Sequence, residues 1–203
     1  AGSINVPTNS WVGSCPVLGG ATFTNMTGQA ASLGEEDILL IHINSAGTAV
    51  QAVSAGSSQH DRGRDVKWVN GQIVLTGDFQ GTGRFGTQVR TAIGVKDLFV
   101  GMYSRQSLNP LWVRTMGRAN GRTRGDKIAI NRCSEITVGV SRPATMTLFD
   151  FAPGSVAKFN ASGNLLWDFP LPANTHDYSF SGLEIRNNGE IITNPPYPPI
   201  KNL

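Results

Sequence analysis

The sequence predicts an all-β protein built from repeated four-stranded antiparallel sheets. Only 15% of its 203 residues are charged, while glycine alone occurs 24 times, a composition typical of short strands joined by many turns. Several segments alternate apolar and polar residues with a period of two, as half-buried strands do. Similar segments also return at a long interval along the chain, which indicates a repeat architecture.

The repeat is defined by three sets of matching segments. Asp97 lies 60 residues after Asp37, and Ser155 lies 58 residues after Asp97. Four short strands in each period predict β-propeller-like blades, arranged radially or in an array, because one such unit cannot bury both its faces alone. We expect almost no helix, and β-structure at 38–43, 72–76, 98–103, 135–140, 156–159 and 190–193.

The expected organisation is about three repeat units plus N-terminal strands. Three complete units are fewer than the four or more blades of most single-chain propellers, so sheet faces and edges should remain exposed. The units and their flanking segments are an N-terminal arm and partial blade at 1–36, repeats at 37–96, 97–154 and 155–194, and a C-terminal extended arm at 195–203.

A glycine-rich run, LTGDFQGTGRFG at 75–86, invites comparison with a phosphate-binding loop. Residues 81–86 read G-x-G-x-x-G, but a dinucleotide fingerprint requires a helix directly afterwards, and GTQVRTAIGVKD is a poor helix former. We therefore expect a connection between blades in which glycine permits positive φ. Phe79 and Phe85 should anchor it to adjacent sheets.

Several of these segments resemble the bacterial β-propeller repeats known as SBBP-type. The resemblance covers roughly 37–194 and rests on DLFV at 97–100, Trp112, QIVLTGDF at 72–79, Phe85-Gly86 and, most closely, VAKFNASGNLLW at 156–167. The second and third units depart from it by ending in VGVS (138–141) and TNP (193–195). The resemblance implies a secreted or cell-surface β-propeller and no particular catalytic activity.

The strand pattern also predicts the core. Trp112 and Trp167 occupy the same position in successive repeats and are flanked by leucine, so we expect both to be packed rather than to stack on sugars. The other residues expected to be buried are Ile73, Val74, Phe99, Ile128, Ile136 and Ile191.

Residues that could carry chemistry are few. The chain has three histidines, His42, His60 and His176, and no nucleophile motif such as G-x-S-x-G. The acidic trio at 35–37 lacks the alternating ligand loop of a calcium site. We therefore expect a protein that is not an enzyme and holds no cofactor or metal.

Charge and cysteine usage limit the partners only weakly. The net charge is +3 and the isoelectric point near 9.1. The basic cluster at 118–132 lacks interleaved aromatic residues, so we expect no nucleic-acid partner, and no apolar run is long enough to span a membrane. Cys15 and Cys133 either form a disulfide in an oxidising compartment or are separate buried residues.

The leading functional prediction is a non-enzymatic extracellular or cell-surface structural protein that associates with copies of itself, or with another surface protein, as a ring or filament. Both chain ends can extend and add to sheet edges. Their apolar anchors are Ile4, Val6, Trp11, Tyr197 and Ile200. The alternative is a lectin-like module that binds carbohydrate, and a hydrolase or lyase is a third class.

Overall fold

The computed structural model describes residues 33–143, 153–172 and 179–194, and all its regular elements are β-strands. The all-β prediction is confirmed, and these ranges contain no helix that could cross a membrane. The strands are β1 (Ile38–Ile43), β2 (Ala49–Gly56), β3 (Arg62–Val69), β4 (Gln72–Phe79), β5 (Thr82–Phe85), β6 (Gln88–Thr91), β7 (Asp97–Ser104), β8 (Pro110–Met116), β9 (Arg124–Ile130), β10 (Ile136–Ser141), β11 (Ser155–Phe159), β12 (Leu165–Pro170), β13 (Leu183–Ile185) and β14 (Ile191–Thr193).

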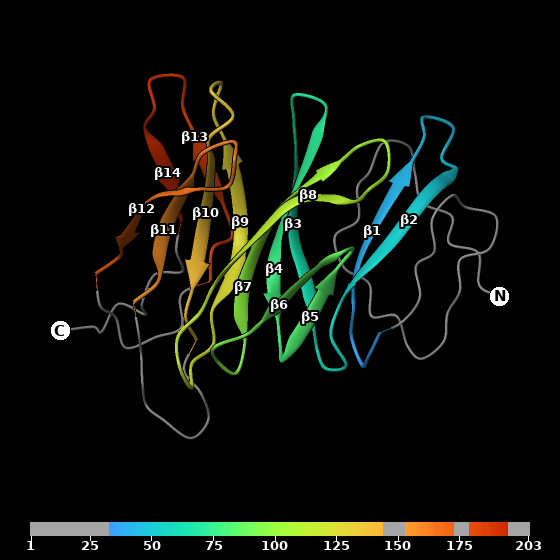
Figure 1. The fold of residues 1–203 in the computed structure, drawn as a ribbon. Helices are drawn as coiled ribbons and strands as arrows, with labels where there is room; N and C mark the ends of the chain where they lie inside the picture. The colour runs from blue at the N-terminus through green and yellow to red at the C-terminus, as the bar shows by residue number, and fades with distance from the viewer. Residues whose placement is uncertain (1–32, 144–152, 173–178, 195–203) are drawn as a thin grey trace, which may run out of the picture.

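These strands form three four-stranded antiparallel sheets and one two-stranded sheet. The first sheet has the order β1-β2-β5-β6, the second β3-β4-β7-β8 and the third β12-β11-β10-β9, while β13 pairs with β14. Figure 1 shows the sheets side by side in a row, like neighbouring blades, with β1 and β2 at one end and β11 to β14 at the other.

The boundaries of the sheets do not coincide with the boundaries of the sequence repeats. The second sheet takes β3 and β4 from the first repeat and β7 and β8 from the second. The third sheet joins β9 and β10 of the second repeat to β11 and β12 of the third in the same way. Each full repeat therefore contributes strands to two sheets, and backbone hydrogen bonds tie successive repeats together. The last pair, β13 and β14, has no such completion in the part of the chain that the structure describes.

The glycine-rich run does cross between sheets, as predicted, but it also contains two strands. Phe79 ends β4 in the second sheet, and the β5–β6 hairpin adds to β2 in the first sheet. The rings of Phe79 and Phe85 are fully buried and meet edge-on, with centroids 5.4 Å apart. Gly81 and Gly86 have positive φ, at 53° and 57°, where β-carbon sterics disfavour other residues.

The second sheet is apolar on both faces because it lies between two others. On β4, Ile73 and Leu75 pack toward the first sheet and Val74 toward the third, as the period-two geometry of a strand requires. The cluster between the first and second sheets contains Ile38, Leu40, Ala55, Ile73, Leu75, Phe79, Phe85, Phe99, Tyr103, Leu108 and Val113. The cluster between the second and third contains Val69, Val74, Leu98, Val100, Met102, Trp112, Ile128, Ile136, Val138, Val140, Ala157 and Phe159.

The two repeated tryptophans have different surroundings. Trp112 is 9% exposed, and its indole N–H donates to the carbonyl of Ala161, in the turn between β11 and β12, at 3.0 Å. The prediction of a buried ring is wrong for Trp167, which is 38% exposed. No turn of the described residues covers Trp167 as the β11–β12 turn covers Trp112. Ile191, which was also expected to be buried, is half-buried.

We predict that Trp112→Ala lowers the free energy of unfolding by about 3–5 kcal/mol, the usual cost of deleting a packed aromatic ring. Leu111→Ala is the matched control, because Leu111 is the neighbouring residue on β8 and is 52% exposed. Its effect should stay below about 1 kcal/mol, since little apolar area leaves the interior. Urea denaturation of both variants measures the difference, and equal costs would contradict the assigned packing.

Candidate functional site

Two buried aspartates fix the turns that precede β1 and β7. The carboxylate of Asp37 accepts hydrogen bonds from the backbone N–H groups of Leu33, at 2.8 Å, and Gly34, at 3.3 Å. The carboxylate of Asp97 accepts from Ile93, at 2.8 Å, and Gly94, at 3.0 Å. The same five-residue turn, which we call a bracket, therefore recurs at 33–37 and 93–97, at the start of two repeats.

Each bracket contains a glycine, Gly34 or Gly94, that lets the turn pack directly against another backbone segment. That segment follows β2 in the first bracket and β8 in the second. A β-carbon added to Gly34 would lie 2.5 Å from the carbonyl oxygen of Ser57, and one added to Gly94 would lie 2.4 Å from that of Arg118. Each bracket thereby joins the start of one strand, β1 or β7, to the residues that follow its paired strand, β2 or β8. Isolated parallel bridges form at the same places, between Glu36 and His60 and between Lys96 and Arg122.

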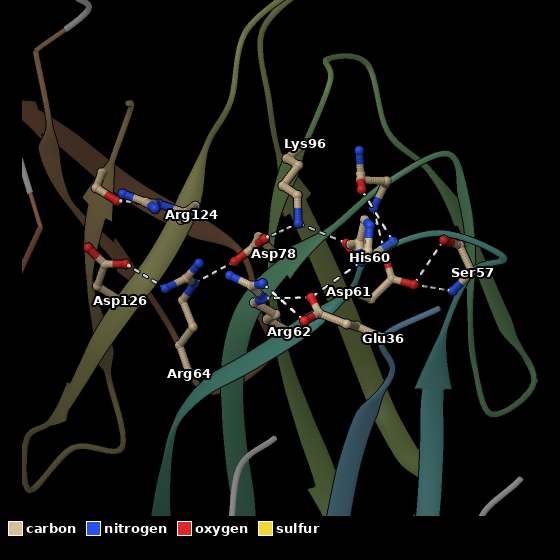
Figure 2. Close-up of polar contacts among 12 residues, drawn as sticks. Glu36, Ser57, His60, Asp61, Arg62, Arg64, Asp78, Lys96, Arg124 and Asp126 are labelled. Atoms are coloured by element: carbon tan, nitrogen blue, oxygen red, sulfur yellow. Dashed lines mark hydrogen bonds and ion pairs between the residues drawn. The ribbon is translucent and has the colours of Figure 1, made fainter. Parts of the chain in front are cut away.

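A second group of charges connects the second and third sheets (Figure 2). The fully buried Asp78 on β4 accepts hydrogen bonds from Arg64 Nε and from Lys96 Nζ, the latter at 2.9 Å. Arg64 Nη1 also lies 3.8 Å from Asp126 Oδ1 on β9. Lys96 donates in addition to the carbonyl of His60 at 2.8 Å. Because a buried carboxylate is costly unless paired, these cations allow Asp78 to remain in the interior.

Asp61 closes the turn between β2 and β3. Its carboxylate accepts hydrogen bonds from the backbone N–H of Ser57, from the Ser57 hydroxyl at 2.8 Å and from the N–H of Gln80 at 2.8 Å. Burial raises the pKa of Asp61, and these three donors act in the opposite direction. Three donors hold one side chain in place, so the group is suited to fixing the turn.

The exposed edge of the cluster is a carboxylate–guanidinium pair. Arg62 donates from Nε and Nη2 to the two carboxylate oxygens of Glu36, at 2.8 and 3.1 Å. The hydrogen bond to Arg62 holds the pKa of Glu36 below its ordinary value. His60 Nε2 lies 2.6 Å from a carboxylate oxygen of Glu35.

These contacts give the polar cluster a structural role. The Ser57 hydroxyl donates to Asp61 and not to an imidazole, so it lacks the adjacent base that activates a serine nucleophile. The acidic trio at 35–37 points its carboxylates at three different partners, namely His60, Arg62 and the backbone before β1. No group of three or more metal-ligating side chains lies close together within the described ranges.

A different kind of surface lies at the far end of the row, on the third sheet. All six residues of β12 are exposed, including Trp167 at 38% and Phe169 at 64%. Trp167 pairs across the strands with Lys158, and Phe169 with Val156, so these side chains share one face. We call Lys158, Trp167 and Phe169 the open face.

The inner half of the same sheet is covered. Gly139 on β10 pairs with Val156, and a β-carbon added to Gly139 would lie 2.6 Å from the ring of Phe180, just before β13. The β13–β14 pair therefore covers β9 and β10 but does not extend over β12. At the opposite end of the row, Leu39 and Ile41 lie on the face of β1 that points away from the core between the first and second sheets. They are nevertheless buried. The outer face of the row is therefore covered at β1 and uncovered at β12.

One of two charged pairs near β12 borders the open face. Lys158 Nζ lies 2.5 Å from Glu135 Oε2 and 6.0 Å from the centre of the Trp167 ring. The second pair, Arg142 and Asp168 at 3.2 Å, lies on the opposite face of the sheet, because Asp168 alternates with Trp167 and Phe169 along β12. The surface combines apolar area with both signs of charge.

The sequence-predicted assembly and disulfide residues are only partly placed. Ile4, Val6, Trp11, Tyr197 and Ile200 lie outside the described residues, and so do Cys15 and His176. Cys133 is exposed in the turn between β9 and β10, which excludes the alternative that it is a buried residue. Its pairing with Cys15 stays a prediction.

Two features of the site were not predicted from the sequence, although each corresponds to a recognisable pattern in it. The brackets correspond to Leu-Gly-x-x-Asp at 33–37 and Ile-Gly-x-x-Asp at 93–97, a match that spans the repeat interval. The open face corresponds to LLWDFP at 165–170, in which adjacent positions are apolar and both faces of the strand would have to be covered.

Comparisons with known proteins do not assign this chain to a group. No protein-family model matches it. No curated protein matches its sequence either. The likeness to SBBP-type repeats therefore remains a resemblance.

We predict that Asp97→Ala lowers the free energy of unfolding by about 3 kcal/mol or more, because two hydrogen bonds to a charged acceptor contribute at least about 1.5 kcal/mol each. Asp168→Ala is the control: Asp168 forms one partly exposed ion pair, and such pairs are typically worth about 1 kcal/mol or less. Chemical denaturation compares the two. A mild effect at Asp97 would contradict the bracket as a stabilising element.

The Glu36–Arg62 pair predicts a pH dependence. The folded-state pKa of Glu36 lies below its ordinary value of 4.5, so the pair stabilises the fold above that pH and the stabilisation is lost as the pH falls through the folded pKa. The difference in unfolding free energy between the wild type and Glu36→Gln, about 1 kcal/mol or less for such a pair, should shrink between pH 7 and pH 3. A difference that stays constant or grows in acid would contradict this assignment.

Proposed function

We propose that this chain is a non-enzymatic, secreted or cell-surface assembly protein whose propeller-like sheets associate with copies of itself through the open face. The observation that carries the proposal is the exposure of Trp167 and Phe169 beside a two-stranded sheet. Aromatic side chains are enriched at the centres of protein interfaces, and burial of a phenylalanine contributes about 1.5–3 kcal/mol.

Strand edges at this end of the molecule can contribute to the contact, as can the outer strands of the other sheets. Among the described strands, β12 pairs only with β11 and β14 only with β13. Each outer edge therefore presents backbone N–H and C=O groups that can pair with an added strand. Natural proteins cover or blunt such edges, and β-strand addition is a common way of binding a partner.

The chemistry of the open face suits a second copy. Lys158 and Glu135 lie beside Trp167 and provide both signs of charge on this face. A two-fold axis through the face would place charges of one copy against opposite charges of the other, with the aromatic rings between them. Such self-complementarity is the requirement for a closed symmetric dimer.

The terminal arms extend this proposal. Ile4, Val6, Trp11, Tyr197 and Ile200 are apolar anchors in segments with few charges, which is the composition needed to lie along an open sheet edge. The resemblance to SBBP-type repeats supports the extracellular or cell-surface location. The polar cluster supports a non-enzymatic role, since its carboxylates are engaged in holding strands and turns.

Light scattering coupled to size-exclusion chromatography tests the proposal. We expect the molar mass of the wild type to rise with protein concentration, and a Trp167→Ser/Phe169→Ser variant to remain monomeric because the apolar part of the contact is removed.

The matched control is Val89→Ser/Ile93→Ser, which removes two exposed apolar side chains on and just after β6, in the first sheet. It should associate as the wild type does. A wild type that is monomeric at all concentrations, or equal masses for the two variants, would overturn the proposal.

A further inference from the structure

Asparagine is followed by glycine at three places in the sequence, each in a turn between strands. This dipeptide is prone to deamidation, because the glycine nitrogen can attack the asparagine side-chain carbonyl carbon with no β-carbon in its way. The attack requires the two atoms to come within about 3–3.5 Å in the correct alignment, which a firmly held turn prevents. The pairs are Asn70-Gly71 between β3 and β4, Asn120-Gly121 between β8 and β9, and Asn188-Gly189 between β13 and β14.

The turn at Asn120 holds the attacking nitrogen in place. The N–H of Gly121 donates to the carbonyl of Arg118 at 3.0 Å. The carbonyl of Gly121 accepts hydrogen bonds from the N–H groups of Val95, at 2.8 Å, and Lys96, at 3.3 Å. Gly121 is also buried. Cyclisation at Asn120 therefore requires hydrogen bonds on both sides of the glycine to break.

The turn at Asn188 is exposed, but both of its reacting groups are engaged. The N–H of Gly189 donates to the carbonyl of Arg186 at 2.9 Å. The side-chain oxygen of Asn188 accepts a hydrogen bond from the N–H of Glu190 at 3.1 Å. These two bonds oppose the approach of the nitrogen to the side-chain carbon.

The turn at Asn70 leaves the attacking nitrogen unengaged. Asn70 and Gly71 are exposed and have positive φ, at 45° and 78°, as in the two-residue hairpin turn that Asn-Gly favours. The N–H of Gly71 has no hydrogen-bond acceptor among the described residues. The restraint on the asparagine is its side-chain Nδ2, which donates at 2.6 Å to the hydroxyl of Ser134 in the β9–β10 turn. Exposed turns of this kind open at a low free-energy cost.

We propose that Asn70 is the preferred site of spontaneous deamidation in this chain, and that its hydrogen bond to Ser134 slows the reaction. The Gly71 nitrogen forms a bond to Cγ of Asn70 and loses its proton to water, while the side-chain nitrogen takes up a proton and leaves as ammonia. Water then opens the cyclic imide at either carbonyl and gives aspartate or isoaspartate. The overall reaction consumes water, releases ammonia and needs no other reactant.

The product changes a contact between two sheets. Both products replace the Asn70 amide, which donates to Ser134, by a carboxylate, which has no donor. Isoaspartate also carries the main chain through the side-chain carbon, so the connection between the paired residues Val69 and Gln72 becomes longer and no longer fits a two-residue turn. Deamidation therefore alters the link between the second and third sheets.

Peptide mapping by mass spectrometry tests the proposal, after incubation of the intact folded protein in mildly alkaline buffer. Isoaspartate is detected by enzymatic methylation. We expect Asn70 to deamidate faster than Asn120 and Asn188. In concentrated urea the three asparagines should react at similar rates, because the hydrogen bonds that distinguish their turns are lost.

Ser134→Gly tests the restraint, since it removes the hydroxyl and glycine tolerates the positive φ of this position, 62°. We expect it to accelerate deamidation of Asn70 by about 2- to 10-fold, the effect of losing one hydrogen bond. Ser162→Gly, the same change in the exposed β11–β12 turn, is the control and should leave the rate unchanged.

Selective deamidation at Asn70 that Ser134→Gly accelerates, and Ser162→Gly does not, supports the proposal. No deamidation at Asn70, a rate at Asn120 or Asn188 that equals or exceeds it in the folded protein, or an unchanged rate in Ser134→Gly overturns it.

Discussion

The second and third sheets each draw strands from two successive repeats, and the rest of the structure depends on this constraint. The first repeat supplies the whole first sheet, but its β3 and β4 become a four-stranded sheet only with β7 and β8 of the second repeat. In the same way, β9 and β10 of the second repeat pair with β11 and β12 of the third. The second sheet then has a neighbour on both faces and is apolar on both. Among the described elements, the third sheet meets β13 and β14 on its outer side, and Trp167 and Phe169 are exposed there.

Polar groups hold the turns and strands in the positions that bring the apolar faces of neighbouring sheets into contact. The Asp37 and Asp97 brackets hold the turns at strand entries, and the glycine of each bracket lets two backbones approach closely. Asp78, paired with Arg64 and Lys96, links strands that also lie next to the third sheet. Buried charge of this kind favours one arrangement of the strands over others more than it adds to the free energy of unfolding. This is useful in a protein whose similar sheets could pair in more than one way.

Much of the fold could be predicted because strand periodicity is a local property. Ile73, Val74 and Phe99 are buried as their alternation indicates. Trp167 could not be predicted, since its exposure depends on whether another sheet follows, and the sequence pattern around it matches that of the buried Trp112. The β5–β6 hairpin was missed because glycine suggests turns, while its pairing with β2 is a long-range contact.

The central claim is that the incomplete end of the row is an association surface. Hydrogen–deuterium exchange measured at low and high protein concentration tests it most directly, because amides on an edge strand become protected when a partner covers them. The amides of β12 and β14 should exchange more slowly at high concentration, and those of β6, the outer strand of the first sheet, should exchange at the same rate at both concentrations. Unchanged exchange in β12 and β14, or protection confined to β6, would contradict the claim.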